Sequence, residues 1–335
     1  MTKKSKESRG PSWRGPDIRP QDIYLRRAFN RVVLDPPEFE PGSWRGAGNC
    51  IKDEKSGLFW LVTRPRTRER RGYCFELYSS KGGDDFSLRG TTAKEELSQL
   101  LGNEVLSIEG QQLLSDPLSD LYYLYLAVDI GHRWQTALLS SDDPLGPWKF
   151  EGLVLRRDHD YDSFEARDAT VGVVGGQYLA IYKASDGNRV NAALAVSSDG
   201  KAWDKRGLLK LGGQRQPAYH FLYGNVVPSE HGPLFIGFES ADVLNKAAIS
   251  KRFVSYLVNE EAVNLLPVFL TTWEPLSSFE RTDFPIHSYG DLVHDPDRSR
   301  ILFFIEAIDP EHSAEVGLNL EVDRVLSYSV GLGEM

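Results

Sequence analysis

Short runs of hydrophobic residues recur along the chain and are separated by polar, turn-forming segments. Each run spans only five or six residues and is rich in aromatic and β-branched side chains, which predicts β-strands and leaves little room for long amphipathic helices. Their spacing of about 60 residues indicates an internal structural repeat. The five runs lie at residues 58–62, 121–126, 178–182, 234–238 and 301–305.

Three of these runs are followed by a similar turn, in which Ser, Asp and Gly precede an aromatic residue. Ser, Asp and Gly favour tight turns through side-chain hydrogen bonds and positive φ angles, and the aromatic residue can pack between neighbouring sheets. The pattern therefore predicts a repeated β-hairpin with a fixed role in the fold. The three copies are Tyr78–Phe86, Leu139–Trp148 and Val196–Trp203, followed by Gly90, Gly152 and Gly207.

A shorter segment that carries a polar residue comes before each hydrophobic run. Such repeats are typical of β-propellers, in which the innermost strand of each blade lines a central channel. We therefore predict an all-β fold, a five-bladed β-propeller, with one polar residue of each segment facing the channel. The segments are 46–50, 107–110, 164–169, 223–227 and 289–293, and their polar residues are Asn49, Glu109, Asp168, Asn225 and Asp291.

The beginning of the chain differs from the rest in composition. Residues 1–22 are predicted to be a disordered basic leader, because Lys3–Arg19 is rich in Ser, Pro and Gly and lacks apolar periodicity. Residues 23–335 are predicted to form one propeller domain. Within it, we expect 23–34 to add an outer strand to the last blade, since pairing the two ends of the ring removes an exposed sheet edge. The clearest helix candidate is Thr92–Leu101.

Composition excludes several classes of partner. The formal net charge of -9 disfavours nucleic acid, because a protein that binds polyanions needs an excess of Lys and Arg. No apolar stretch approaches the roughly 20 residues that span a bilayer, and the N-terminus lacks a signal-peptide core, so we expect no membrane partner and a cytoplasmic protein. Cys50 and Cys74 are expected to be small buried residues, and the lack of closely spaced ligands predicts no cofactor and no metal.

Strand direction predicts where the polar groups meet. Adjacent strands of a blade run antiparallel, so the end of each hydrophobic run lies beside the start of the polar segment before it. Two rings of polar residues should therefore meet at one mouth of the channel. Crowded carboxylates do not ionise independently, and a carboxylic acid beside a carboxylate is what glycoside cleavage needs. The runs end at Arg64, Asp129, Lys183, Glu239 and Glu306.

Two motifs resemble a known group of enzymes. The turn Asp143–Trp148 and the strand Phe164–Asp168 resemble elements of the five-bladed glycosidases of families 43, 32 and 130, and the resemblance covers most of the chain after about Pro41. Gly46–Asn49 and Phe59–Arg66 look most like the mannoside phosphorylases and hydrolases of family 130. The resemblance implies a carbohydrate-processing enzyme whose ligand is a small oligosaccharide or glycoside.

The resemblance also implies roles and shows two departures. Arg167–Asp168 is similar to the Arg-Asp element that helps to stabilise the sugar in families 32 and 43. Asn49 stands where those families have a catalytic Asp, and Ala169 stands where they have Pro, which puts an unmodified family 43 mechanism in doubt.

We predict four catalytic carboxylates. An ionised Asp168 is expected to hold the sugar, and two of the others to act as acid and base in an inverting reaction, because side chains from separate blades favour the wide spacing that admits water. A regular strand would place Glu165 and Asp168 on opposite faces, which a bulge would change. The predicted catalytic residues are Asp168, Glu109, Glu239 and Asp291, and the predicted substrate-binding residues are Asn49, Arg64, Glu165, Arg167, Lys183, Asn225 and Tyr289.

Three functions remain open at this point. A glycoside hydrolase is the leading hypothesis. A phosphorylase is the second, because Arg64, Arg66 and Lys183 are suited to hold inorganic phosphate beside the sugar. The third is a propeller that binds carbohydrate without catalysis, since the fold does not decide the chemistry.

Overall fold

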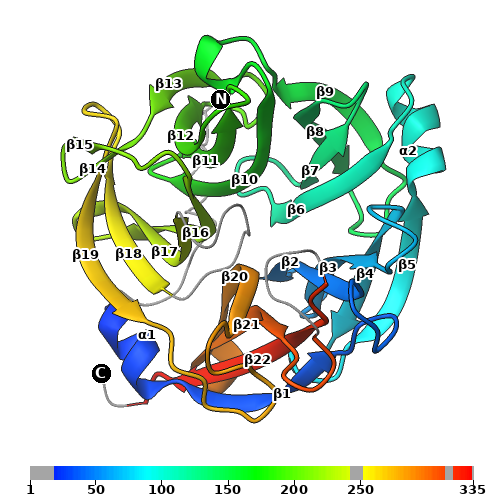
Figure 1. Ribbon diagram of the computed structural model, residues 1–335, viewed down its shortest axis with the longest axis vertical. Helices are drawn as coiled ribbons and strands as arrows, with labels where there is room; N and C mark the ends of the chain where they lie inside the picture. Colours follow the sequence, from blue (N-terminus) through cyan, green and yellow to red (C-terminus); the bar gives the residue numbers. More distant parts are fainter. Residues whose placement is uncertain (1–18, 242–251, 314–319, 334–335) are drawn as a thin grey trace, which may run out of the picture.

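The chain forms an all-β, propeller-like structure in which strands are arranged around a central axis (Figure 1). The computed structural model describes residues 19–241, 252–313 and 320–333. Antiparallel pairing joins consecutive strands into runs of four, which we call groups 1 to 5. In Figure 1, the first strands of the groups, β2, β6, β10, β16 and β20, lie nearest the centre.

The first three groups follow one another along the chain. Group 1 contains β2 (Trp44–Lys52), β3 (Phe59–Arg66), β4 (Cys74–Ser80) and β5 (Ser87–Ala93). Group 2 contains β6 (Ser107–Ser115), β7 (Tyr122–Asp129), β8 (Trp134–Ser141) and β9 (Lys149–Leu155). Group 3 contains β10 (Glu165–Val174), β11 (Gln177–Ser185), β12 (Val190–Ser197) and β13 (Asp204–Leu208).

The last two groups complete the circuit. Group 4 contains β16 (His220–Ser229), β17 (Gly232–Ala241), β18 (Arg252–Asn259) and β19 (Asn264–Thr272), with the short strands β14 (Lys210–Leu211) and β15 (Gln214–Arg215) beside β19. Group 5 contains β20 (Ile286–Asp295), β21 (Arg300–Ile308), β22 (Asp323–Gly331) and, from the other end of the chain, β1 (Ala28–Leu34). The helices are α1 (Pro20–Arg26), α2 (Lys94–Leu101), η1 (Asp160–Asp162) and η2 (Pro296–Arg298).

The segment 23–34 differs from the single outer strand that we expected. It is helical up to Arg26, in α1, and forms a strand only from Ala28, where β1 pairs with β22. The prediction was wrong for the first part because Pro20 begins the helix and Asp22 lies in its first turn, both of which favour a helical start. Ile23 is buried and anchors the helix in the core.

The core consists of hydrophobic clusters between neighbouring groups. The described residues form one such cluster at each junction from group 1 to group 5 and another between groups 5 and 1. The aromatic residues of the repeated turns take part, as predicted: Trp203 packs against Tyr125 of group 2 and Tyr178 of group 3, and Phe86 packs against Phe304. Both cysteines are buried and unpaired. No helix among the described residues is long and apolar enough to cross a membrane.

Side-chain amides link the inner strands of neighbouring groups. Asn49 in β2 donates to the Leu113 carbonyl at 2.7 Å and accepts from the Leu113 N–H at 2.6 Å. Gln112 in β6 binds both backbone groups of Val171 in β10 in the same way. We call these two-bond contacts amide clasps. They provide hydrogen-bond partners for backbone N–H and carbonyl groups that face a neighbouring inner strand and have no partner in a β-ladder.

The remaining junctions use related contacts. Asn225 in β16 accepts from the Leu292 N–H at 2.8 Å and donates to Asp291 at 2.6 Å, and Asp291 in turn accepts from the Cys50 N–H at 2.7 Å. Between β10 and β16, a Cβ atom at Gly172 would lie 2.1 Å from the Val226 carbonyl oxygen, so only glycine permits this approach. The inner strands are therefore connected around the whole axis.

We predict that Asn49→Ala lowers the free energy of unfolding by about 2–4 kcal/mol, because it leaves a buried N–H and a buried carbonyl of Leu113 without partners. Urea unfolding measures the change. Asn188→Ala, in an exposed loop, is the matched control and should change stability by less than about 0.5 kcal/mol. Equal stability of the two variants would contradict a structural role for the clasp.

Candidate functional site

Irregular pairing marks four of the five inner strands near the end at which they begin. The register shifts lie between Ala47 and Cys50 in β2, between Glu109 and Gln111 in β6, and between Arg167 and Thr170 in β10. A fourth shift occurs between Ile286 and Gly290 in β20, whereas β16 pairs continuously with β17. Bulges of this kind redirect side chains and are common beside active sites.

Asp168 lies in the bulge of β10 and has a strained backbone. Its φ angle is 53°, in the left-handed region that is unusual for a residue other than glycine. The side chain packs against Gly110, where a Cβ atom would lie 2.2 Å from Asp168 Oδ1. Asp168 is buried, and its Oδ1 has no hydrogen-bond partner within the described residues.

Arg167 gathers carboxylates from two groups of strands. Its guanidinium forms ion pairs with Glu109 of β6, with Glu165 at 3.2 Å and with Asp168 at 3.7 Å. Lys183, opposite Arg167 in the register of β10 and β11, lies 3.6 Å from Glu165 and 4.0 Å from Asp168. The structure thus brings these five predicted residues together, and the bulge places Glu165 and Asp168 on the same side. We call them the Arg167 cluster.

The carboxylates of the Arg167 cluster have different proton affinities. Burial alone would raise the pKa of Glu109, but the charges of Arg167, Arg64 and nearby cations bring it well below its ordinary value. Burial likewise opposes a lowered pKa at Glu165, and Lys183 and Arg167 overcome it. Burial raises the pKa of Asp168, because the attraction of Arg167 and Lys183 does not offset the loss of water. The direction of this shift runs against our expectation that Arg167 favours an ionised Asp168.

Arg64 presents a cation to the same region. It is 5% exposed, and its guanidinium lies against Gly46 at the start of β2. Within the described part of the chain, the Arg64 side chain forms no hydrogen bond or ion pair. Its charge helps to lower the pKa of Glu109, and it partly offsets the burial that raises the pKa of Glu306 to about 8.

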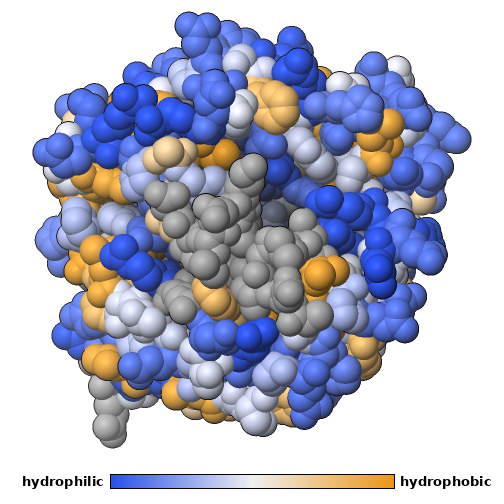
Figure 2. All heavy atoms as spheres, viewed as in Figure 1, coloured by the Kyte–Doolittle hydropathy of each residue, from blue (hydrophilic) through white to orange (hydrophobic). Residues whose placement is uncertain are grey.

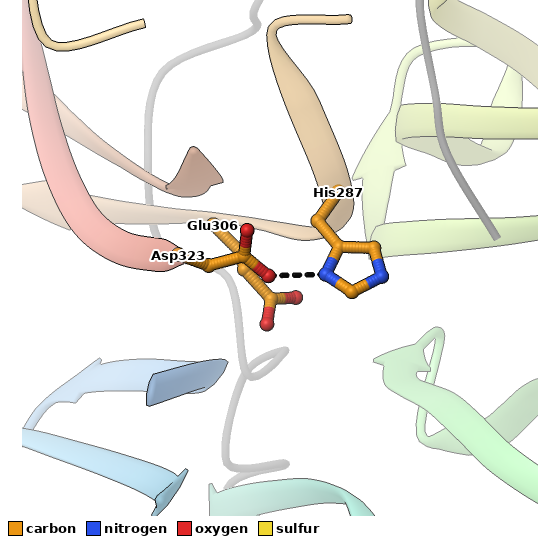
Figure 3. Close-up of side chains that lie close together, drawn as sticks. All are labelled: His287, Glu306 and Asp323. Carbon is orange, nitrogen blue, oxygen red and sulfur yellow. Dashed lines mark hydrogen bonds and ion pairs between the residues drawn. The ribbon is translucent and has the colours of Figure 1, made fainter. Parts of the chain in front are cut away.

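A second charged cluster lies in group 5 and consists of His287 in β20, Glu306 in β21 and Asp323 in β22, which we call the His287 triad (Figure 3). His287 Nδ1 is hydrogen-bonded to Asp323. Burial would lower the pKa of His287, but Asp323 and Glu306 raise it to about 10. The rings of His287 and Trp44 pack in a T-shaped arrangement, with centroids 4.8 Å apart.

Sequence reasoning identified only part of this triad. Glu306 was noted as the end of a hydrophobic run, and no role was given to Asp323. The start of the third strand carried no recognisable pattern in the repeats, and Asp323 opens the third strand of group 5. A search for acidic residues at the start of third strands would have found it.

Two cavities on the axis show where the predicted channel residues lie. A small cavity of about 20 Å³ is lined by Asn49, Asp168 and Asp291, with Tyr223 and Tyr289. A larger one of about 350 Å³ is lined by Asn49, Asn225, Cys50 and Gln112 among others. Asn49 and Gln112 border both cavities, so the amide clasps lie at the level that separates them.

The predicted ring of five polar residues therefore needs one correction. The residue of β6 that matches Asn49 and Asn225 is Gln112, which forms an amide clasp, whereas Glu109 lines neither cavity and lies in the Arg167 cluster. The β6 bulge after Glu109 separates these two positions along the strand. Polar side chains at the inner strands thus divide into structural clasps and members of the charged clusters.

Other predicted residues have their own partners. Glu239 accepts hydrogen bonds from Tyr256 at 2.6 Å and pairs with Arg252 at 2.6 Å and His220 at 3.3 Å. Burial raises the pKa of Asp291 to about 7 despite its bonds to the Cys50 N–H and Asn225. Tyr289 packs against Tyr223, with ring centroids 4.6 Å apart.

The fold is similar to that of several solved carbohydrate-active enzymes. A family 117 glycoside hydrolase of the marine bacterium Zobellia galactanivorans has a TM-score of 0.61 and 14% identity, over 93% of this chain and 92% of that one. A thermostable family 43 glycoside hydrolase has a TM-score of 0.60 and 15% identity, over 85% and 89%. The β-1,2-mannobiose phosphorylase of Listeria innocua has a TM-score of 0.55 and 10% identity, over 91% of each chain.

These similarities confirm the predicted resemblance to the glycosidases of families 43, 32 and 130 at the level of the fold. No protein-family model and no curated protein sequence matches the chain. At identities this low, residue roles cannot be carried over by alignment, and the chemistry has to be argued from the site itself.

We predict that Glu109→Gln lowers the free energy of unfolding by about 3 kcal/mol at pH 7, because it leaves Arg167 with less compensating charge in a buried site. The folded pKa of Glu109 is depressed, so its ionised form stabilises the protein above the unfolded pKa near 4.5, and this contribution is lost as pH falls through the folded pKa. The difference between wild type and variant should shrink below about pH 4.5.

Urea unfolding at a series of pH values tests this pattern. Glu104→Gln, an exposed carboxylate near the start of β6, is the control and should show little difference at any pH. A Glu109→Gln effect that stays constant from pH 7 to pH 3 would show that lost packing, and not charge, causes it.

Proposed function

We propose that this protein is a five-bladed β-propeller enzyme that cleaves glycosidic bonds. The five groups of strands are its blades, each packed on the next through a separate hydrophobic cluster. The observation that carries the proposal is the Arg167 cluster, where a carboxyl group with a raised pKa, Asp168, lies beside an ionised carboxylate, Glu109. Glycoside cleavage uses one group of each kind.

Asp168 is the proposed proton donor. It is buried, burial raises its pKa, and one of its oxygens, Oδ1, has no partner among the described residues. Glu109 remains ionised beside Arg167 and is suited to stabilise the positive charge that develops on the sugar ring. Trp134, which packs against the Arg167 guanidinium at 4.5 Å, and Tyr219 are the proposed sugar platforms.

The spacing of this pair bears on stereochemistry. Glu109 and Asp168 both contact Nη1 of Arg167, so their oxygens lie closer together than the roughly 6.5 Å minimum of an inverting pair. Retention of configuration is therefore favoured over the inversion that we expected from the sequence. NMR of the first-formed anomer distinguishes the two outcomes.

We predict that Asp168→Asn lowers turnover by about 10²- to 10⁴-fold, because the amide keeps the shape of the side chain and cannot donate the proton. Activity is measured on a panel of 4-nitrophenyl glycosides and manno-oligosaccharides. Asp204→Asn, at an exposed site in β13, is the control and should retain wild-type turnover. A folded Asp168→Asn variant with unaltered turnover would exclude Asp168 as the donor, and sugar binding by the wild type without turnover would favour a non-catalytic propeller.

Phosphorolysis is a second candidate, and Arg64 favours it. The Arg64 guanidinium is buried without an ion pair among the described residues, and the charges of Arg64 and Arg71 add to burial in lowering the pKa of Arg66 to about 9. Crowded cations of this kind are suited to an anionic ligand such as inorganic phosphate. A phosphorylase is among the proteins of similar fold.

We predict that, if phosphate is the acceptor, Arg64→Met lowers phosphate-dependent turnover by roughly 10- to 100-fold through the loss of a charge-assisted contact. The panel is assayed with and without inorganic phosphate. Arg68→Met, at an exposed position after β3, is the control. Wild-type turnover that is independent of phosphate would reject phosphorolysis and leave hydrolysis.

A further inference from the structure

We propose that the His287 triad binds a divalent transition-metal ion directly through one atom of each side chain. The candidate ligand atoms of His287, Glu306 and Asp323 all lie within 4.8 Å of one another. One imidazole nitrogen and two carboxylate oxygens form a mixed set that Zn²⁺ and Mn²⁺ accept. Figure 3 shows the imidazole and the two carboxyl groups facing one another from three strands.

The three ligands stand on a rigid support. β20, β21 and β22 are consecutive antiparallel strands, and Asp323 begins the pairing of β22 with β21 opposite Ile308. The shift in register between Ile286 and Gly290 places His287 in an irregular part of β20, and the His287 ring packs against Trp44 in a T-shaped arrangement. A site built on paired strands holds its ligands more closely than one built on loops.

Unpaired oxygens provide an independent argument for a ligand. Glu306 Oε2 and Asp323 Oδ1 are buried in side chains that are 1% and 0% exposed, and neither has a hydrogen-bond partner within residues 19–241, 252–313 and 320–333. A buried polar atom without a partner costs about 1–3 kcal/mol. A bound cation would satisfy both atoms.

The His287–Asp323 ion pair alone does not account for this arrangement. It uses Oδ2 of Asp323 and leaves Oδ1, and it provides no partner for Glu306 Oε2. Elsewhere in the core, Glu280 shows the usual solution: one oxygen accepts from Trp273 Nε1 at 2.9 Å and the other from the Tyr328 hydroxyl. The triad therefore resembles a metal coordination shell. It differs from a buried ion pair in which every oxygen accepts a hydrogen bond.

The metal site differs from our expectation of no metal, which rested on the absence of closely spaced ligands in the sequence. Here the three ligands come from three strands and are brought together only by the fold. The site does not depend on the glycosidase proposal. The charge of Arg64 acts both on Glu306 of the triad and on Glu109 of the Arg167 cluster.

The test uses the full chain after treatment with a chelator, titrated with MnCl₂ or ZnCl₂ alone by calorimetry. We expect one site per chain. Glu306→Gln, which keeps the shape of the side chain, should weaken metal binding by at least 10-fold. Glu280→Gln, an equally buried carboxylate outside the triad, is the matched control and should bind metal as the wild type does. Circular dichroism verifies that each variant is folded.

A spectroscopic measurement keeps the proposal testable if Glu306→Gln does not fold. Pulsed electron paramagnetic resonance of wild-type protein with Mn²⁺ should detect a directly bound histidine nitrogen, and His287→Gln should abolish that signal. No stoichiometric binding by the wild type, equal affinity in folded Glu306→Gln, or bound Mn²⁺ without a histidine signal would each overturn the proposal. None of these results bears on glycoside turnover, so the two proposals fail separately.

Discussion

The structure depends on how the inner strands satisfy the backbone groups that face the axis. Apart from single parallel bridges from β2 to β22 and from β10 to β8, each inner strand pairs with the second strand of its own group, and its other edge faces the next group of strands. Asn49, Gln112 and Asn225 supply the missing hydrogen bonds with amides that donate and accept at once, and Asp291 supplies an acceptor for the Cys50 N–H. Without these contacts, buried N–H and carbonyl groups at the centre of the molecule would lack partners.

Because of this constraint, the structural hydrogen bonds and the charged clusters lie at different levels along the axis. Where the amide clasps lie, the polar side chains form hydrogen bonds with neighbouring strands. The backbones also approach closely, as at Gly172 and Val226. At the ends where the inner strands begin, bulges interrupt the ladder and charged residues replace amides. There the hydrogen-bonding capacity is incomplete: Asp168, Glu306 and Asp323 each retain a buried oxygen without a partner in the described chain.

The sequence predicted the strands well because hydrophobic runs and turns are local signals. All five predicted runs lie within or overlap the second strands of the groups, and the helix expected at Thr92–Leu101 is present as α2. The outer segment 23–34 was misjudged because Pro20, outside the segment considered, starts a helix. The register of the inner strands was predicted less well. In β6, the bulge after Glu109 determines that Gln112, and not Glu109, forms the amide clasp.

The site was predictable in position and only partly in chemistry. Strand direction predicted that Asp168 and Lys183 lie at the same end, and the contact between them agrees with that. Asn49 and Asp168 look alike in sequence as polar residues of inner strands, yet one forms a clasp and the other a strained, buried carboxyl. The direction of the Asp168 pKa shift was not predicted, because sequence shows that Arg167 is adjacent to Asp168 but does not show how completely water is excluded.

The buried carboxyl groups of the site explain why it also contains several cations. Glu109, Glu165, Asp168 and the His287 triad would repel one another if all ionised in a buried space, and burial would then favour protonation of each. Arg167 and Lys183 hold Glu109 and Glu165 ionised, while Asp168 has its pKa raised beside the same guanidinium. The pKa values of these neighbouring carboxyl groups therefore shift in opposite directions, because the cations outweigh burial at Glu109 and Glu165 whereas burial outweighs them at Asp168. Arg64 forms no ion pair in the described part of the chain, and its charge acts on Glu109 of one cluster and on Glu306 of the other.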